Sequence, residues 1–138
     1  MATMETLKLE IVTPDAIVFC EDVHMVTMPG VDGQFGVYPH HVHLITQVVP
    51  GEIIVTNNGR ERYLAIGEGL VEITGRRVTI VTDMAIPAER IDEARVEEAR
   101  ARAEARLREH ISDEEVASVN ASLVRSLAQL QVRRRRKM

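Results

Sequence analysis

The feature that most constrains the fold is a change of pattern at Pro87. Upstream of it, short runs alternate apolar with polar residues, as Leu7, Leu9 and Ile11 do near the N-terminus. Downstream, residues 88–110 contain no glycine or proline and are rich in alanine, glutamate and arginine, which favour helix. This division predicts a β domain followed by a helical domain.

Turn residues separate the alternating runs in the first part of the chain. Pro14-Asp15 follows the first run, and Asn58-Gly59 predicts a type I′ hairpin turn because both central positions of that turn need positive φ. Many short strands at close spacing are typical of an antiparallel sandwich or barrel. We therefore predict an antiparallel β-sandwich of two sheets over residues 1–86.

The second part, residues 87–138, predicts an antiparallel two-helix hairpin, which makes the fold class α+β. Ser112-x-x-Glu115 is a capping box and places the start of a second helix near Asp113. One apolar stripe then recurs at spacings of three and four residues. Its members are Val116, Val119, Leu123, Leu127 and Leu130.

Charge follows the same division. Residues 1–85 carry 5 basic and 11 acidic side chains, a net charge of −6, whereas residues 86–138 carry 12 basic and 10 acidic side chains, a net charge of +2. On the first predicted helix, Glu98 and Arg102, and likewise Glu104 and Arg108, stand four residues apart in the favourable order for ion pairs. We therefore expect two such pairs along that helix.

Three histidines, His40, His41 and His43, raise the question of a metal site. In an extended segment His41 and His43 share one face and His40 lies on the other, so the segment supplies two ligands where zinc sites need three or four. No Asp, Glu or Cys stands at a diagnostic spacing nearby. A loop without metal is favoured, and a small metal-binding protein remains the alternative.

The chain ends in a basic tail, which consists of Arg133, Arg134, Arg135, Arg136 and Lys137. Clustered arginines can neutralise nucleic-acid phosphates, so a nucleic-acid adaptor is a second alternative. Against it, the chain has a net charge of −4 and no aromatic residue among these cations. Cations at a helix C-terminus also complement the helix dipole and then extend into solvent.

One glycine-rich segment is specific enough to indicate a family. The segment PGVDGQFGVYPHHVHL, residues 29–44, resembles the pattern P-G-x-x-G-x-x-G-[IV]-[LY]-P-x-H-x-P-L of the epsilon subunit of F-type ATP synthase. The resemblance covers essentially the whole chain and includes VTIVTDMA and IDEAR further along. The sequence departs from the pattern at His43, where the family usually has proline.

The resemblance implies a function without bond chemistry. Members belong to the central stalk, the rotor that couples ion flow to ATP synthesis, and they contact the gamma subunit, the c-ring and the alpha/beta catalytic head. No apolar run approaches the roughly 18 residues that a membrane span needs, so we expect a soluble subunit that meets the membrane only through its complex. The implied location is peripheral, on the cytoplasmic face of the bacterial inner membrane, with no nucleic-acid partner.

The resemblance also implies functional residues. By analogy, His41 faces gamma, no cofactor is required, and the hairpin with its basic tail inhibits ATP hydrolysis. The c-ring contact would be made by Gln34, Phe35 and Gly36. Ile91-Asp92-x-x-Arg95 resembles a regulatory ATP-binding motif of some bacterial members, with Arg102 and Arg125 assisting. The alternative interpretation is that Asp92 only favours a helix N-terminus and that Arg95 is a solvated surface residue.

Overall fold

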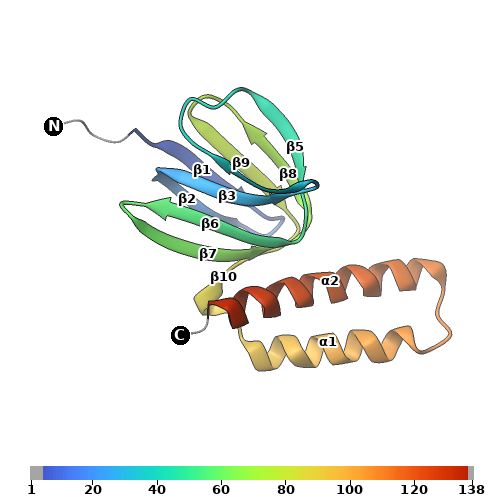
Figure 1. The fold of residues 1–138 in the computed structure, drawn as a ribbon. Helices are drawn as coiled ribbons and strands as arrows, with labels where there is room; N and C mark the ends of the chain where they lie inside the picture. Colours follow the sequence, from blue (N-terminus) through green and yellow to red (C-terminus); the bar gives the residue numbers. More distant parts are fainter. Residues whose placement is uncertain (1–4, 137–138) are drawn as a thin grey trace.

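The computed structural model describes residues 5–136 and has two parts, a β-sandwich and a helical hairpin beneath one side of it (Figure 1). The strands are β1 (Leu7–Val12), β2 (Ile17–Val23), β3 (Met25–Gly30), β4 (Gly33–Val37), β5 (Leu44–Val48), β6 (Gly51–Asn57), β7 (Arg60–Ile66), β8 (Gly69–Ile73), β9 (Arg77–Thr82) and β10 (Ala85–Pro87). The helices are the 3₁₀ turn η1 (Ala88–Arg90), α1 (Glu93–Leu107) and α2 (Asp113–Arg135). The predicted α+β class is confirmed.

The strands form a continuous hydrogen-bonded ladder that folds over on itself. Its order is β10-β7-β6-β3-β5-β8-β9-β1-β2, with β4 paired only to β3 at an edge. All pairs are antiparallel except β1 with β9, which is parallel, so the prediction of purely antiparallel pairing is wrong at that point. A parallel neighbour needs a long connection, and here most of the sandwich separates the two strands in sequence.

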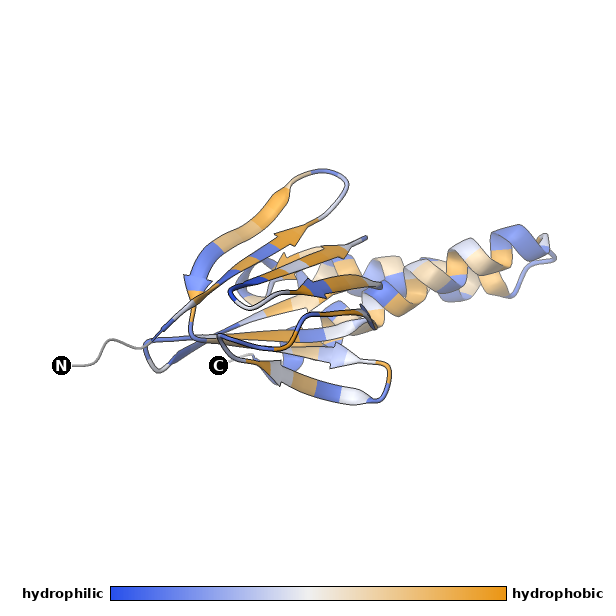
Figure 2. Cartoon of the chain, turned by 90° about the horizontal axis from the view of Figure 1, so that it is seen from above, coloured by the Kyte–Doolittle hydropathy of each residue, from blue (hydrophilic) through white to orange (hydrophobic). Residues whose placement is uncertain are grey.

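The alternating pattern of the strands produces the core. Figure 2 shows the strands banded with hydrophilic and hydrophobic residues, because successive side chains point to opposite faces. The enclosed side chains are nearly all aliphatic: Leu7, Leu9, Ile11, Val26, Met28, Val37, Val48, Ile53, Val55, Ile66, Val71, Ile73, Val78 and Ile80. The sandwich therefore has a hydrophobic core of its own.

The turn between β6 and β7 confirms the hairpin prediction. Asn58 and Gly59 have φ angles of 54° and 77°, as a type I′ turn requires. The backbone N–H of Asn58 donates a hydrogen bond to His24 Nδ1 at 3.0 Å. His24 therefore stabilises a turn.

The cap predicted at the start of the second helix is confirmed, whereas the first helix begins later than predicted. Ser112 caps α2 and accepts a hydrogen bond from the Glu115 N–H at 3.2 Å. The first helix, expected directly after Pro87, begins only at Glu93, because β10 and η1 occupy the residues before it. Asp92 is its N-cap and accepts from the Arg95 N–H at 3.2 Å.

The apolar stripe of α2 is only partly buried. Leu130 is buried, but Leu127 leaves 46% of its surface exposed. The hairpin extends beyond the sandwich in both views (Figures 1 and 2), so the first turns of α2 lie away from the strands. Over residues 5–136, no helix is both long and apolar enough to span a membrane.

Candidate functional site

The glycine-rich segment forms the β3–β4 hairpin and leaves one edge strand exposed. Gly33 has a φ of 120°, which a residue with a side chain adopts only with strain. A Cβ on Gly30 would lie 2.8 Å from the Phe35 ring, so Gly30 must lack a side chain for that ring to pack on the core. Gln34 and Gly36 are exposed on β4. The hairpin therefore presents a short polar edge.

The three histidines do not converge. His40 contacts the Glu5 carboxylate, whereas the ring of His41 donates its Nδ1–H to the Val42 carbonyl at 2.9 Å. His43 is exposed. Among residues 5–136, no group of three or more His, Cys, Asp or Glu side chains is placed to hold a metal ion. The geometry gives the metal-binding alternative no support.

Apolar side chains surround this histidine loop on the surface. Tyr38, Val42, Leu44 and Ile45 are all exposed, and Val42 is the most exposed of them at 77%. Exposed apolar side chains close together in the chain are typical of a surface that a partner covers. The segment from β4 to β5 thus combines a polar edge with an apolar loop.

A second candidate site is a hollow of about 350 Å³ between η1, α1 and α2. This volume lies at the lower end of small-molecule sites, which are about 300–1,000 Å³. Its lining includes the predicted Ile91, Asp92, Arg95 and Arg102, together with Arg90, which the sequence interpretation missed. The predicted motif therefore does line a hollow.

The hollow is electropositive. Three guanidinium groups, those of Arg90, Arg95 and Arg102, line it against one carboxylate, that of Asp92, and within the described part of the chain none of the three arginines forms an ion pair. The predicted Glu98–Arg102 pair is not formed, which leaves Arg102 available. Such a cluster can pair with an anion.

Arg125 does not join this cluster. Its Nη1 lies 3.3 Å from Asp83 Oδ2, and it lines a different hollow with Pro50 and Glu68. The structure therefore brings Arg95 and Arg102 together but places Arg125 at the boundary between α2 and the sandwich.

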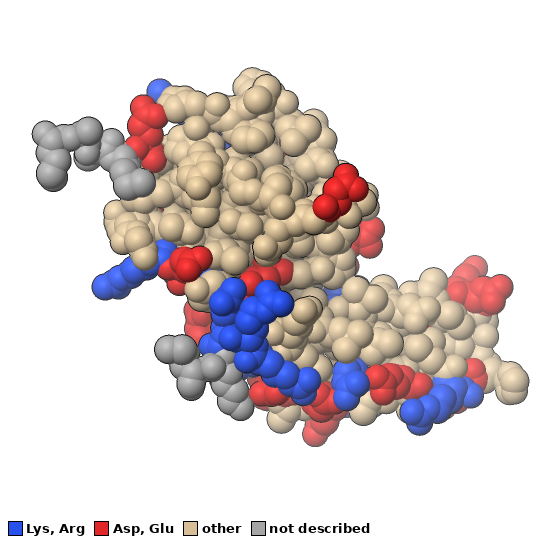
Figure 3. All heavy atoms as spheres, viewed as in Figure 1, with Lys and Arg blue, Asp and Glu red and all other residues tan. Residues whose placement is uncertain are grey.

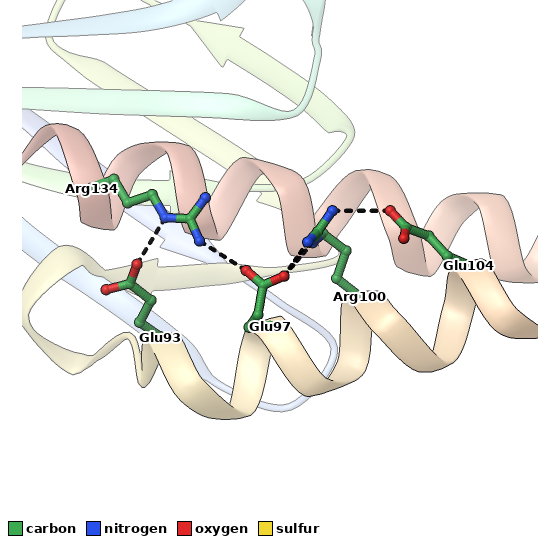
Figure 4. Close-up of polar contacts among 5 residues, drawn as sticks. All are labelled: Glu93, Glu97, Arg100, Glu104 and Arg134. Carbon is green, nitrogen blue, oxygen red and sulfur yellow. Dashed lines mark hydrogen bonds and ion pairs between the residues drawn. The ribbon is translucent and has the colours of Figure 1, made fainter.

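The basic tail is helical through Arg135, and Arg134, Arg135 and Arg136 form ion pairs. Arg134 bridges α2 to α1 by donating to Glu93 and Glu97, each at 2.8 Å (Figure 4). Glu97 also pairs with Arg100, whose hydrogen bond is the main cause that holds the pKa of Glu97 below its ordinary value. Arg100 continues the chain of contacts to Glu104 at 3.0 Å, so Glu104 pairs with Arg100 and the expected Arg108 pair is not formed. This network links the two helices.

The end of α2 contacts the sandwich. Figure 3 shows Lys and Arg side chains gathered where the hairpin meets the sandwich. Arg136 donates to both oxygens of Glu52 on β6, at 2.8 and 2.9 Å, and Arg135 lies 3.5 Å from the same carboxylate. The hydrogen bond to Glu52 raises the pKa of the Arg136 guanidinium. Lys137 lies outside the described residues.

These ion pairs bear on the nucleic-acid alternative. Three of the four described tail arginines, Arg134, Arg135 and Arg136, already pair with carboxylates, so their charges are not free to neutralise phosphates. The alternative interpretation, cations that extend into solvent, does not account for these pairs. Arg134 and Arg135 leave 56% and 49% of their side chains exposed, but they also contact carboxylates on α1 and β6.

Comparison with known proteins accounts for both parts of the chain, residues 6–133. Residues 6–88 match the family described as ATP synthase, Delta/Epsilon chain, beta-sandwich domain, and residues 89–133 match the long alpha-helix domain of the same chain. The ATP synthase epsilon chain of Herpetosiphon aurantiacus is 40% identical over 131 residues, which covers 95% of this chain and 96% of that protein. ATP synthase epsilon chain 2 of Syntrophotalea carbinolica is 41% identical over 129 residues, covering 93% and 94% respectively.

Solved structures share the fold. A chain in the Euglena gracilis mitochondrial ATP synthase structure of OSCP, F1 and c-ring superposes with a TM-score of 0.71 at 22% identity, covering 90% of this chain and 79% of that one. A chain in the Tetrahymena thermophila mitochondrial ATP synthase central stalk and c-ring structure gives 0.59 at 13% identity, covering 96% and 99%. At these identities the likeness concerns architecture alone.

Proposed function

The chain belongs to the family of ATP synthase epsilon chains, non-catalytic subunits of that complex, and from this premise we propose that it is a rotor subunit of the central stalk that couples ion translocation to ATP synthesis. The observation that carries the proposal is the family match over both parts, the sandwich and the long helices. In this role the chain binds gamma, the c-ring and the alpha/beta head. It is peripheral on the cytoplasmic face of the bacterial inner membrane.

The β4–β5 surface is the proposed site of contact with the rest of the rotor. Gln34, Phe35 and Gly36 meet the c-ring, and His41 lies toward gamma. The exposed polar edge of β4 and the exposed apolar loop beside it support this assignment. An edge strand leaves backbone groups free for an incoming loop.

Co-purification tests the rotor assignment directly. The chain is expressed with its gamma subunit, only gamma carries an affinity tag, and the eluate is analysed for a stoichiometric complex. We expect the two subunits to elute together. If folded, tagged gamma elutes without this chain and the chain stays in the flow-through, the rotor proposal loses its main support.

We further propose that the hairpin inhibits ATP hydrolysis. The apolar residues Val124 and Leu127 of α2 are exposed, and basic residues end the same helix, so α2 offers both an apolar and a cationic surface to a partner. Deletion of the chain from Ser112 onward in the assembled enzyme is expected to accelerate hydrolysis while synthesis is largely kept. Unchanged hydrolysis after that deletion would make the hairpin a passive element.

The electropositive hollow is the proposed site of regulatory ATP. Arg90, Arg95 and Arg102 supply cations for the phosphates, and Ile86 and Val96 supply apolar surface in the same hollow. The test is titration of the isolated chain with millimolar ATP while the proton signals of the hairpin are recorded. We expect shifts at α1 residues lining the hollow. Their absence would contradict the proposal.

A further inference from the structure

A buried carboxylate on the sandwich is neutralised only by the end of α2. Glu52 leaves 4% of its side chain exposed, and within residues 5–136 its side chain bonds only to Arg135 and Arg136. The Arg136 contact is bidentate, with Nε–Oε2 at 2.9 Å and Nη2–Oε1 at 2.8 Å. A planar guanidinium fork matched to both carboxylate oxygens is among the strongest charge-assisted contacts in proteins.

An aromatic ring completes this arrangement. The Arg136 Cζ lies 3.8 Å from the centroid of the Tyr63 ring on β7, a cation–π contact. In the β6–β7 pair, Glu52 lies opposite Ala65 and Tyr63 lies opposite Ile54, so Glu52 and Tyr63 are on the same face of the sheet. We call Glu52, Tyr63 and Arg136 the C-terminal latch.

The hairpin also meets the sandwich through an apolar cluster and exposed polar links. The cluster groups Val132 of α2 with Ala65, Ala88 and Ile91. The polar links join Arg125 to Asp83 at 3.3 Å, in which both side chains are at least one-third exposed, and Gln129 to the Met84 sulfur. At the helix end, by contrast, Glu52 is buried, so loss of Arg136 would leave an unpaired charge in the docked state, which is strongly destabilising.

Release of α2 from the sandwich would change the environment of Glu52. In the docked state a carboxylate excluded from water requires its partner, since an unpaired buried charge is strongly unfavourable. When the helix end departs, water reaches the carboxylate, so the undocked state carries no buried charge. The pair therefore favours docking specifically and can be removed without damaging the sandwich core.

We infer that the C-terminal latch sets the resting position of the hairpin, holding α2 on the sandwich and keeping the basic tail occupied. The consequence for catalysis rests on the proposed function: the same arginines cannot contact acidic segments of the catalytic head until the latch opens. Glu52 of the sandwich and the acidic segments of the catalytic head therefore compete for the same tail arginines. Loss of Glu52 then shifts the hairpin toward the released state while leaving the tail intact.

The latch is tested in the isolated full-length chain by a distance measurement. Nitroxide labels are placed on the native exposed Cys20 of β2 and on a cysteine introduced by His110→Cys at the hairpin tip. Electron spin resonance then reports the fraction of molecules with the compact label separation. For Arg136→Met and Glu52→Gln we expect at least a tenfold rise in the ratio of released to compact molecules, and the double variant should exceed neither single variant.

A matched control separates the latch from a general effect of tail charge. Arg133→Met removes the same charge from the same helix end, but Arg133 forms no ion pair within residues 5–136. The ratio of released to compact molecules for this variant should therefore stay within twofold of that for the parent chain. A parent-like ratio for Arg136→Met overturns the latch. Because Arg136 lies at the chain end and not in the sandwich core, that result decides the question even if Glu52→Gln folds poorly. Additive effects in the double variant also overturn it.

Hydrolysis by the assembled enzyme distinguishes the latch from the proposed function. Glu52→Gln keeps every tail cation, so release of the hairpin should strengthen inhibition and lower the hydrolysis rate severalfold. Spin-label release with unchanged hydrolysis would support the latch and refute inhibition by the hairpin. Absence of release in both latch variants refutes the latch, whatever the hydrolysis rate.

Discussion

Substitutions at Gly30 and Gly36, two glycines of the β3–β4 hairpin, are predicted to affect different properties. A side chain at Gly30 should lower the stability of the fold, whereas a bulky side chain at Gly36 should disturb the contact with the c-ring. A Cβ on Gly36 would lie 3.7 Å from Met25 Sδ and 3.7 Å from Thr27 Oγ1, which is ordinary van der Waals contact. Gly36→Ala should therefore fold normally and gain about 0.5–1 kcal/mol in free energy of unfolding, because glycine is unfavourable inside a strand. Gly36→Trp points its ring outward and should change stability by only about 0.5 kcal/mol.

Gly30→Ala is the structural control. Its Cβ would lie 2.8 Å and 2.9 Å from two atoms of the Phe35 ring and 3.0 Å from the Gly33 carbonyl oxygen. Overpacking of this kind costs about 1–3 kcal/mol. Urea unfolding of the isolated chain should therefore rank Gly36→Ala as most stable, then Gly36→Trp, then Gly30→Ala.

The functional readout uses the assembled enzyme in membranes. If β4 meets the c-ring, Gly36→Trp should lower ATP-driven ion pumping or the yield of complex, although the subunit itself is stable. Gly36→Ala should pump normally. Normal assembly and pumping with Gly36→Trp would refute the c-ring contact, and a loss of stability in Gly36→Ala equal to that of Gly30→Ala would refute the packing argument.

Three further predictions concern the hairpin, the hollow and acid stability. Val132→Ala removes two buried methyl groups at about 0.8 kcal/mol each, so it should weaken hairpin docking by about 1–2 kcal/mol, as measured by amide hydrogen exchange of α2. Arg102→Gln should weaken ATP binding at least tenfold in calorimetric titration, whereas Arg108→Gln, outside the hollow, should leave it unchanged. Arg62 hydrogen bonds lower the pKa of Glu21, so this pair stabilises the fold above the unfolded-state pKa of about 4.3 and ceases to do so as pH falls through the folded-state pKa. Because both side chains are nearly half exposed, Glu21→Gln should cost only about 0.2–1 kcal/mol in urea unfolding at pH 7, and the cost should shrink as the pH falls through the lowered folded-state pKa of Glu21.

The sequence predicted those parts of the fold that depend on local chemistry. Asn58-Gly59 and Ser112 act within a few residues of themselves, and both form the turn and the cap that were expected. The first helix begins at Glu93 and not directly after Pro87, because the 3₁₀ turn η1 occupies Ala88–Arg90 and Asp92 caps the helix. Ala88 is buried in a cluster with Ala65 and Val132, and local propensity alone does not show such packing.

The residues of the candidate sites also divide into those whose position follows from local sequence and those whose position depends on tertiary packing. Arg95 and Arg102 were proposed from the family motif; they are about two helical turns apart on α1 and therefore share one face, which lines one hollow. Arg125 was misplaced because its position depends on how α2 packs against Asp83. The contact between Glu52 and Arg136 was not predicted, because the two residues are 84 positions apart in the sequence and only the fold brings them together.

A rotor subunit turns relative to the alpha/beta head, and we expect this chain to do so. The most direct test attaches a visible probe through the native exposed Cys20 in enzyme whose alpha/beta head is fixed to a surface, and follows the probe while ATP is hydrolysed. Cys20 lies on β2, which pairs with neither β4 nor β5, so the label should leave the proposed c-ring contact intact. We expect unidirectional rotation of the probe that stops when ATP is removed, and a probe that stays stationary while the same enzyme hydrolyses ATP would refute the rotor proposal.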